Sequence, residues 1–315
     1  MSDVASMIRA KALELGFEKA GFAVADLLRP ELEQLRRWID LGYHGQMGWL
    51  EREPTKRADP RMIFPSAKTV VVLAMNYNTS HEHTDDIARG KISRYAWGDD
   101  YHDVMREKMA DLLEWIKSRI PDVEGKICVD TAPMMDKAWA VRAGLGWLGK
   151  HSNLITKDLG SWIFIGEIIL SIAIDDDTTV IEDHCGTCTA CLDACPTNAI
   201  VEPYVVDSQK CISYATIELR DEIMLPEIAG ELNGWVYGCD ICQDVCPWNR
   251  FEKPTGESRF EPRRGETSLD IEEIESMTQD EYVDRFRKSA IKRTKLTGLK
   301  RNANALKTLR NAKAS

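Results

Sequence analysis

The sequence predicts an α+β protein, in which a region of mixed helices and strands is followed by a cysteine-rich module and a short helical region. Strand-length apolar segments alternate with amphipathic segments as far as residue 178. Eight of the nine cysteines then fall between Cys185 and Cys246, and a basic helical pattern follows them. We therefore predict three domains, at residues 1–178, 179–255 and 256–315. A chain of 315 residues that is 43% hydrophobic can bury a substantial core.

Hydrophobic spacing predicts the elements of the first domain. Amphipathic helices are expected at residues 3–16, 30–41 and 103–120. Strands are expected at residues 20–24, 69–75 and 126–129, with one or two more between residues 162 and 174. The segment at 69–75 is apolar throughout, which is typical of a strand buried on both faces. A further helix is expected to open at Asp130–Pro133 and to run to Arg142, because proline suits a first helical turn.

The cysteines form two runs with a characteristic spacing. The first reads Cys-x-x-Cys-x-x-Cys-x-x-x-Cys-Pro from Cys185, the second reads Cys-x-x-Cys-x-x-x-Cys-Pro from Cys239, and Cys211 lies between them. In bacterial proteins this spacing gives three thiolates to one 4Fe-4S cluster, while the last cysteine of the run crosses to the other cluster. We therefore assign Cys185, Cys188, Cys191 and Cys246 to cluster one, and Cys195, Cys211, Cys239 and Cys242 to cluster two.

Two other uses of paired cysteines compete with this interpretation. Structural zinc also takes Cys-x-x-Cys pairs, but it does not require the Cys-x-x-x-Cys-Pro endings. A disulfide framework needs an oxidising compartment, which nothing else in the sequence indicates. Iron–sulfur binding is therefore favoured, with zinc as the main alternative. The ninth cysteine, Cys128, lies outside the pattern and is expected to be a small buried core residue.

The sequence predicts a cytoplasmic protein with no membrane partner. The first residues show no basic segment followed by an apolar run, so no secretory signal is recognised. The longest apolar stretches, near residues 69–75 and 162–174, are too short or too interrupted to span a bilayer. We expect a monomer, although the sequence carries no direct signal for the oligomeric state.

Charge is distributed unevenly along the chain. The net charge is -10, yet residues 285–315 contain eleven Lys or Arg and no Asp or Glu. A basic segment on an acidic protein attracts a polyanion by neutralising its phosphates and releasing counterions. The alternative is a solvated helix face, and the charge alone favours neither. Apolar residues recur at helical spacing in this segment, so we expect it to be folded.

Three local motifs have ordinary structural explanations. The segment from Gly144 to Lys150 matches the dinucleotide pattern G-x-G-x-x-G, but that fingerprint must follow a strand and open a helix, whereas this segment follows a helix. We interpret it as a helix C-cap and a tight loop. The pair His81 and His83 is interpreted as solvated surface. The segment Arg94–His102 fits a pocket wall or a plain helix entry equally well.

Asp130 is the strongest candidate for a catalytic carboxylate, because it lies where a strand ends and a helix is expected to begin. Its alternative role is to cap that helix. Burial would raise its pKa and let it act as a general acid near neutral pH, whereas a helix N-terminus would lower the pKa. Asp136 is the competing candidate, with a role as a first-turn helix acid as its alternative.

Several segments together resemble the epoxyqueuosine reductase family. The segments that carry the resemblance are Arg94–Asp103, Val129–Lys137, Arg142–Lys150, the first cysteine run, Cys211–Glu218 and Tyr237–Pro247. The resemblance implies an N-terminal α/β cobalamin-binding domain related to reductive dehalogenases and nitroreductases, a two-cluster bacterial ferredoxin-like module, and HEAT-like C-terminal helices. It also implies that tRNA carrying epoxyqueuosine at the wobble position is reduced to queuosine, with loss of the epoxide oxygen as water.

The resemblance further implies roles for individual residues. An external low-potential donor would supply electrons through the clusters to cobalamin, and the basic C-terminal segment would contact tRNA. Asp130 matches the proton donor of the family motif Val-Asp-Thr and is expected to contact cobalamin. The other cobalamin contacts that the resemblance implies are Arg57, Ser93, Ser152, Asn153, Leu154 and Ser213. Ordinary loop or core packing is the alternative for each of them.

Two other functions remain open. A reductive dehalogenase-like cobalamin enzyme that acts on a small molecule would share the clusters and the corrin. A ferredoxin-type electron carrier would share only the clusters, and it would have no need of residues 1–178. Bound corrin separates the enzymes from the carrier, and a requirement for tRNA separates the two enzymes.

Overall fold

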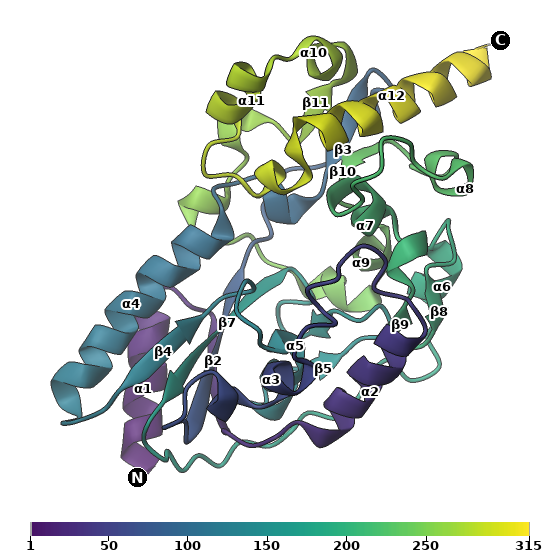
Figure 1. Ribbon diagram of the computed structural model, residues 1–315. Helices are drawn as coiled ribbons and strands as arrows, with labels where there is room; N and C mark the ends of the chain where they lie inside the picture. The colour runs from purple at the N-terminus through teal and green to yellow at the C-terminus, as the bar shows by residue number, and fades with distance from the viewer. Residues whose placement is uncertain (1, 315) are drawn as a thin grey trace.

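A four-stranded antiparallel sheet forms the centre of the N-terminal region (Figure 1). The computed structural model describes residues 2–314. Its strands lie in the order β1-β2-β7-β4 and comprise β1 (Lys19–Val24), β2 (Thr69–Asn76), β7 (Ile163–Leu170) and β4 (Gly125–Cys128). In the central strand β7, Glu167 is the register partner of both Val72 and Cys128.

Both faces of this sheet are covered by helices. One face packs on α1 (Ser2–Glu14) and α4 (Tyr101–Arg119), with Val71 and Ile168 among its buried side chains. The opposite face packs on α5 (Asp136–Arg142), with Val72 and Ile169 in the core. Every residue of β2 is buried, which confirms the prediction of a strand buried on both faces.

The other predicted elements of this region are found within a few residues of their expected bounds. Helix α2 (Arg29–Asp40) is followed by the short α3 (Pro54–Ala58), and Cys128 is buried in the core as expected. The segment after α5 turns at Gly144, where φ is +68°, and leads into β5 (Trp147–Leu148) and β6 (Leu154–Ile155). A Cβ atom on Gly146 would lie 2.0 Å from the carbonyl oxygen of Ile155, so the glycine is required by close backbone packing. The interpretation as a C-cap and a tight loop is confirmed.

Helix α5 begins later than the sequence suggested. It starts at Asp136, with Met135 at the N-cap, so the predicted helix start at Asp130–Pro133 is wrong. Asp130 has a φ of 47°, in the left-handed region, and the amide of Met134 donates to the carbonyl of Ala132 in a local turn. These conformations break the helical pattern, because a right-handed helix needs negative φ at each residue. Asp130 therefore lies in a loop, residues 129–135, and does not cap the helix.

The cysteine-rich module contains only short elements. They are α6 (Ala190–Ala194), β8 (Ile200–Glu202), β9 (Val205–Val206), α7 (Ile212–Ile217), α8 (Pro226–Ala229), β10 (Trp235–Tyr237) and α9 (Ile241–Asp244). The helices α6 and α9, which carry cysteines of the two runs, pack against each other. Metal ligation commonly replaces a large apolar core in modules of this size.

The C-terminal region packs on the cysteine-rich module through a second core (Figure 1). A three-stranded sheet joins β10, β3 (Arg89–Ile92) and β11 (Ser268–Asp270). The helices that follow are α10 (Ile271–Ser276), α11 (Gln279–Arg285), the 3-10 helix η7 (Ala290–Thr294) and α12 (Lys295–Ala314). Ile92, Ile212, Trp235 and Leu299 share this core, so residues from all three predicted domains contribute to it. Mixed helices and sheets are thus observed, while the three domain boundaries stay a prediction.

Within residues 2–314, no helix combines the length and the apolar character needed to cross a bilayer.

Candidate active site and cluster-binding cysteines

The eight cysteines of the two runs form two neighbouring groups in space. Cys191 lies close enough to Cys185, Cys188 and Cys246 for their charges to interact. In the other group, Cys211 interacts with Cys195, and Cys239 and Cys242 interact with Cys211. Cys242 also interacts with Cys191, so the two groups are adjacent, and the assignment of individual cysteines to each cluster stays a prediction. Among residues 2–314, no three His, Cys, Asp or Glu side chains converge as they would around a single metal ion.

The environment of these cysteines keeps their thiols protonated until iron binds. Burial, followed by the charges of the neighbouring cysteines, raises the pKa of Cys191 to about 11. Burial and the approach of Cys211 also raise the pKa of Cys242. Ionising several adjacent thiols is unfavourable without a cation, and iron binding removes their protons and compensates their charge. The residues present therefore fit two 4Fe-4S clusters.

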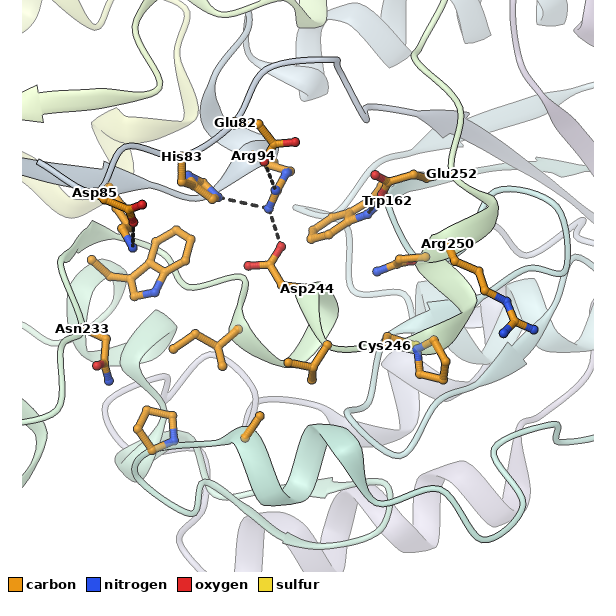
Figure 2. A pocket seen from close by; sticks show the side chains of 18 of the residues that line it. Glu82, His83, Asp85, Arg94, Trp162, Asn233, Asp244, Cys246, Arg250 and Glu252 are labelled. Carbon is orange, nitrogen blue, oxygen red and sulfur yellow. Dashed lines mark hydrogen bonds and ion pairs between the residues drawn. The ribbon is translucent and has the colours of Figure 1, made fainter.

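A cavity of about 1090 Å³ opens beside the first cysteine group (Figure 2). Cys246 forms part of its wall, together with Trp162, Trp235 and Arg250. At its centre, Arg94 Nη1 lies 3.1 Å from His83 Nε2 and donates to Asp244 Oδ1 at 2.5 Å. Within the segment Arg94–His102, Arg94 alone lines this cavity, whereas Tyr101 and His102 form the entry of α4.

His83 does not match the interpretation as solvated surface. Its side chain is only 12% exposed, it lies 3.2 Å from Asp240 Oδ2, and its ring stacks edge-on against Trp97 and Trp235. His81 is exposed and pairs with Glu261, as a surface histidine does. The loop folds back over β10 and buries one of the two histidines, which the polar local sequence does not reveal.

A second group of polar residues surrounds Asp130, outside the cavity. His102, in the first turn of α4, bridges two carboxylates, with Nε2 3.1 Å from Asp130 Oδ2 and Nδ1 2.6 Å from Asp100 Oδ1. Asp100 also caps α4 by accepting from the amide of His102. The ring of Tyr101 stacks between Phe164 and His102. The cap and the stacking together fix the orientation of the imidazole.

The electrostatics of this group differ from the sequence-based expectation. Burial lowers the pKa of His102, but the hydrogen bonds to Asp100 and Asp130 outweigh it and raise that pKa to about 9. Burial raises the pKa of Asp130, but the hydrogen bond and the charge of His102 outweigh it, so the net shift is downward. Of the two shifts that the sequence left open, the downward one is found, but its cause is the cationic partner of a side chain that is 57% exposed and not a helix N-terminus. At neutral pH the proton resides on His102.

Three of the residues implied as cobalamin contacts lie in the neighbourhood of Asp130 and Asp136. Arg57, in α3, is close enough to both carboxylates to interact with their charges. Lys137 Nζ donates to the carbonyl of Ser152 and to Asn153 Oδ1, which ties that loop to the start of α5. None of the six implied contacts lines the cavity beside Cys246.

Of the remaining implied contacts, Leu154 and Ser93 are buried and Ser213 is half-buried. Leu154 is buried in β6, and Ser213 lies in α7 next to Cys211 and Ile212. Ser93 is buried, and its hydroxyl donates to Asp240. The role of each of these residues in cofactor binding stays a prediction.

Unpartnered polar atoms indicate where a polar cofactor could bind. Within residues 2–314, Arg57 Nε and His151 Nε2 are buried and have no hydrogen-bond partner. His151 follows directly on the glycine loop, and burial lowers its pKa to about 4, so its ring is neutral. Buried polar groups without partners are uncommon in folded proteins, and a ligand is one usual explanation. The amides and hydroxyls of a corrin could satisfy both atoms, so the residues present fit cobalamin.

Sequence reasoning did not identify His102 and Glu167 as site residues. His102 lies in a segment that the sequence left open between a pocket wall and a helix entry. Glu167 interrupts the apolar segment 162–174, and a charge inside a strand buried on both faces was the signal that could have identified it.

The fold and the site define a two-cluster iron–sulfur protein with an additional region of mixed helices and sheet that carries a polar site. Residues 184–249 match the family model of a 4Fe-4S double cluster binding domain, and residues 57–131 match the model of epoxyqueuosine reductase QueG, DUF1730. The chain is 48% identical over 301 residues to the epoxyqueuosine reductase of Cellulophaga algicola, which covers 96% of this chain and 97% of that protein. It is 50% identical over 274 residues to that of Synechocystis sp., which covers 87% of this chain and 94% of that protein.

Solved structures give the same result. A selenomethionine-labelled epoxyqueuosine reductase superposes with a TM-score of 0.91 at 31% identity, over 98% of this chain and 82% of that one. An epoxyqueuosine reductase bound to an epoxyqueuosine-modified tRNA-Tyr stem loop superposes with a TM-score of 0.90 at 31% identity, over 98% and 81% of the two chains. This chain belongs to the epoxyqueuosine reductase family. The zinc and disulfide alternatives are accordingly set aside.

Replacing one proposed ligand is expected to remove one cluster. In Cys246→Ser the first set loses a thiolate, so the iron content after anaerobic reconstitution should fall from about eight to about four atoms per chain. Cys128→Ser is the matched control, because Cys128 is also buried but lies outside both groups, and it should keep the full iron content. Full iron in Cys246→Ser, or zinc in the unaltered protein, would contradict the ligand assignment.

Proposed function

We propose that this protein reduces epoxyqueuosine to queuosine in tRNA, with cobalamin and two 4Fe-4S clusters as cofactors. The observation that carries the proposal is the position of the Asp130–His102 pair. This pair lies beside a basic C-terminal segment. The same chain also contains two groups of four cysteines. The guanidinium of Arg293 is close enough to Asp130 to lower its pKa, and the carbonyl of Lys288 accepts from the amide of Asp100 at 2.8 Å. A polyanion held by this segment would therefore reach the carboxylate.

The basic residues of the C-terminal region divide into two sets. Some are neutralised within the protein, since Lys307 pairs with Glu272 and Glu275, and Arg285 pairs with Glu266 and Glu273. Others are exposed, and no carboxylate of residues 2–314 lies within ion-pair distance of them; they are Arg287, Lys288, Lys292 and Lys295. These four lie within and on either side of η7, and the backbone of one of them, Lys288, contacts Asp100. They are the side chains that we propose to contact the phosphates of tRNA.

The His102–Asp130 pair can supply a proton to the epoxide oxygen. Reduction of an epoxide to an alkene takes two electrons and two protons and releases one water. The proton held on His102 Nε2 can pass to Asp130 Oδ2, 3.1 Å away, and from that carboxyl to the oxygen. Covering Asp130 with bound cofactor and RNA would remove water from it and raise its pKa, which favours its acid form.

Residues of this chain would also bind the cofactors and provide a docking site for the electron donor. Arg57, Ser152 and Asn153 would bind cobalamin next to Asp130, with Leu154, Ser93 and Ser213 as further contacts. When bound, cobalamin supplies electron transfer to an epoxide carbon, with electrons that arrive through the clusters. We propose that the external donor docks at the cavity of Figure 2, because Cys246 of the first set is part of its wall.

Other parts of the proposal concern the whole protein. We propose that the C-terminal helices are HEAT-like, that the first region is the cobalamin-binding domain with its boundary near residue 178, and that the iron–sulfur module ends near residue 255. We also propose that the protein acts in the cytoplasm as a monomer. The relatives named as epoxyqueuosine reductases support a place among tRNA-modifying enzymes.

Loss of the protein is expected to leave its substrate in tRNA. Nucleoside mass analysis of tRNA from cells that lack the protein should show accumulated epoxyqueuosine in place of queuosine. Re-expressing the unaltered chain should restore queuosine, whereas Asp130→Asn, which cannot carry the proton, should slow its formation by about 100-fold or more. Normal queuosine in the cells without the protein would refute the function, and full activity of Asp130→Asn with normal cobalamin content would refute the acid role.

The reaction is expected to depend on the charge of His102. Because its pKa is raised to about 9, the imidazolium is present below that pH and is lost as the pH rises through it. Single-turnover rates should therefore fall above about pH 9. In His102→Gln, which keeps a hydrogen bond to Asp130 but carries no proton to transfer, the rate should be lower by about 100-fold, with tRNA binding intact. A His102→Gln variant with the unaltered pH profile would show that this histidine supplies no proton.

Neutralising the exposed basic residues is expected to weaken tRNA binding in a salt-dependent manner. For Arg287→Gln and Lys292→Gln, the slope of log Kd against log salt should become shallower by about 0.7 to 0.9 for each phosphate that the variant no longer neutralises. Lys307→Gln is the matched control, because Lys307 is already paired with Glu272 and Glu275. Equal effects of all three substitutions would mean that net charge, and not this surface, attracts tRNA.

A further inference from the structure

Two acidic side chains meet inside the protein, behind the loop that carries Asp130. Glu167 lies in the middle of β7 and is fully buried, and Asp136 is the first residue of α5. Strand alternation places Glu167 on the face of the sheet that packs against α5, together with Ile165 and Ile169. The Asp136 and Glu167 carboxyls are within hydrogen-bonding distance of each other.

The environment of this pair requires a proton between the two groups. Within residues 2–314, neither carboxylate oxygen of Glu167, nor Oδ1 of Asp136, is offered a hydrogen by any N–H or O–H donor. Two ionised carboxylates would leave all three buried oxygens unsatisfied and would repel each other. One proton converts the same contact into an O–H···O⁻ hydrogen bond, which is among the stronger kinds.

The charged and titratable neighbours of the pair do not remove this requirement. Asp130 and Lys137 flank Asp136, Arg57 of α3 approaches it, and Cys128 of β4 faces Glu167. Burial followed by the charge of Asp130 raises the pKa of Asp136 to about 7, and burial followed by Asp136 raises the pKa of Glu167 well above its usual value. The pair therefore retains a proton at neutral pH.

The position of the pair in the chain gives it a mechanical role. Residues 129–135 connect β4 to α5. The last residue of β4, Cys128, is the register partner of Glu167, and Asp136 is the first residue after the loop. A hydrogen bond between Glu167 and Asp136 thus joins the two ends of the loop. Two further side-chain contacts of the loop, from His102 to Asp130 and from Arg106 to Thr131, are more exposed.

We propose that Asp136 and Glu167 share one proton, and that the resulting hydrogen bond is a staple that holds the loop of Asp130 in place. Both are positioning residues, because they act through the loop. The link to catalysis depends on the proposed role of Asp130, but the staple itself does not. Among solved relatives, one structure of the Bacillus subtilis epoxyqueuosine reductase is described as having its catalytic loop swung out of the active site. A staple at the base of such a loop would bias it toward the closed position.

Two substitutions at one position test the staple in the full chain loaded with cobalamin and clusters. Glu167→Gln keeps a donor for Asp136, whereas Glu167→Leu has a similar volume and no donor. Hydrogen–deuterium exchange of residues 129–135 reports the loop, and the infrared carbonyl band of a protonated carboxyl at neutral pH reports the shared proton. Thermal unfolding checks the fold. Glu124→Gln, an exposed acid just before β4, is the matched control.

We expect the unaltered protein and Glu124→Gln to show the infrared band and the same loop protection. Glu167→Gln should lose the band yet keep its protection within about threefold, and Glu167→Leu should exchange about tenfold faster while its unfolding temperature is maintained. Absence of the band in the unaltered protein would overturn the shared proton. Unchanged protection in Glu167→Leu, or equal loss in both variants, would overturn the staple. Because exchange is measured without tRNA, a failure of Asp130→Asn to impair turnover would refute the acid role and leave the staple standing.

Discussion

The approach of the two cysteine runs to each other, which we propose is held by shared cluster ligation, is the constraint on which much of the structure depends. Cys246 belongs to the second run, yet it lies with Cys185, Cys188 and Cys191, so the chain must return to the first run after an insertion that contains α7, α8 and β10. That return brings α9 against α6 and places β10 beside β3. The segment after β3 leads directly into Asp100 and His102. Metal binding and the geometry of the site are therefore connected through the backbone.

The carboxyl groups of the site differ in protonation state: those that contact His102 are ionised, whereas the buried pair behind them holds a proton. Asp100 and Asp130 stabilise the imidazolium of His102, which in turn keeps Asp130 anionic. A few residues away, Asp136 and Glu167 face each other without a cation in hydrogen-bonding contact and hold a proton instead. The same side-chain chemistry thus gives opposite protonation states, because Asp130 is exposed and has a cationic partner, whereas the facing oxygens of Asp136 and Glu167 are buried.

The local sequence pattern was sufficient to predict those elements that depend on a single property, such as hydrophobicity or residue spacing. The apolar segment around Val72 specified a strand covered on both faces, and the spacing of the cysteines specified two groups of four. The start of α5 could not be predicted, because the left-handed backbone at Asp130 is selected by the loop as a whole, while proline and threonine nearby are equally compatible with a helix start. The pKa of Asp130 depends on His102, which is distant in sequence, so the sequence left the direction of its shift open. The buried state of His83 likewise depends on Trp97 and Trp235.

The cavity beside Cys246 and the polar group around Asp130 have no lining residue in common. A reductant docked at the first and an RNA bound over the second would not compete for the same surface. All three molecules could then form one complex, in which the clusters are recharged while the nucleic acid stays in place. The order in which donor and RNA arrive would be free, and turnover would not require either of them to leave before the other binds.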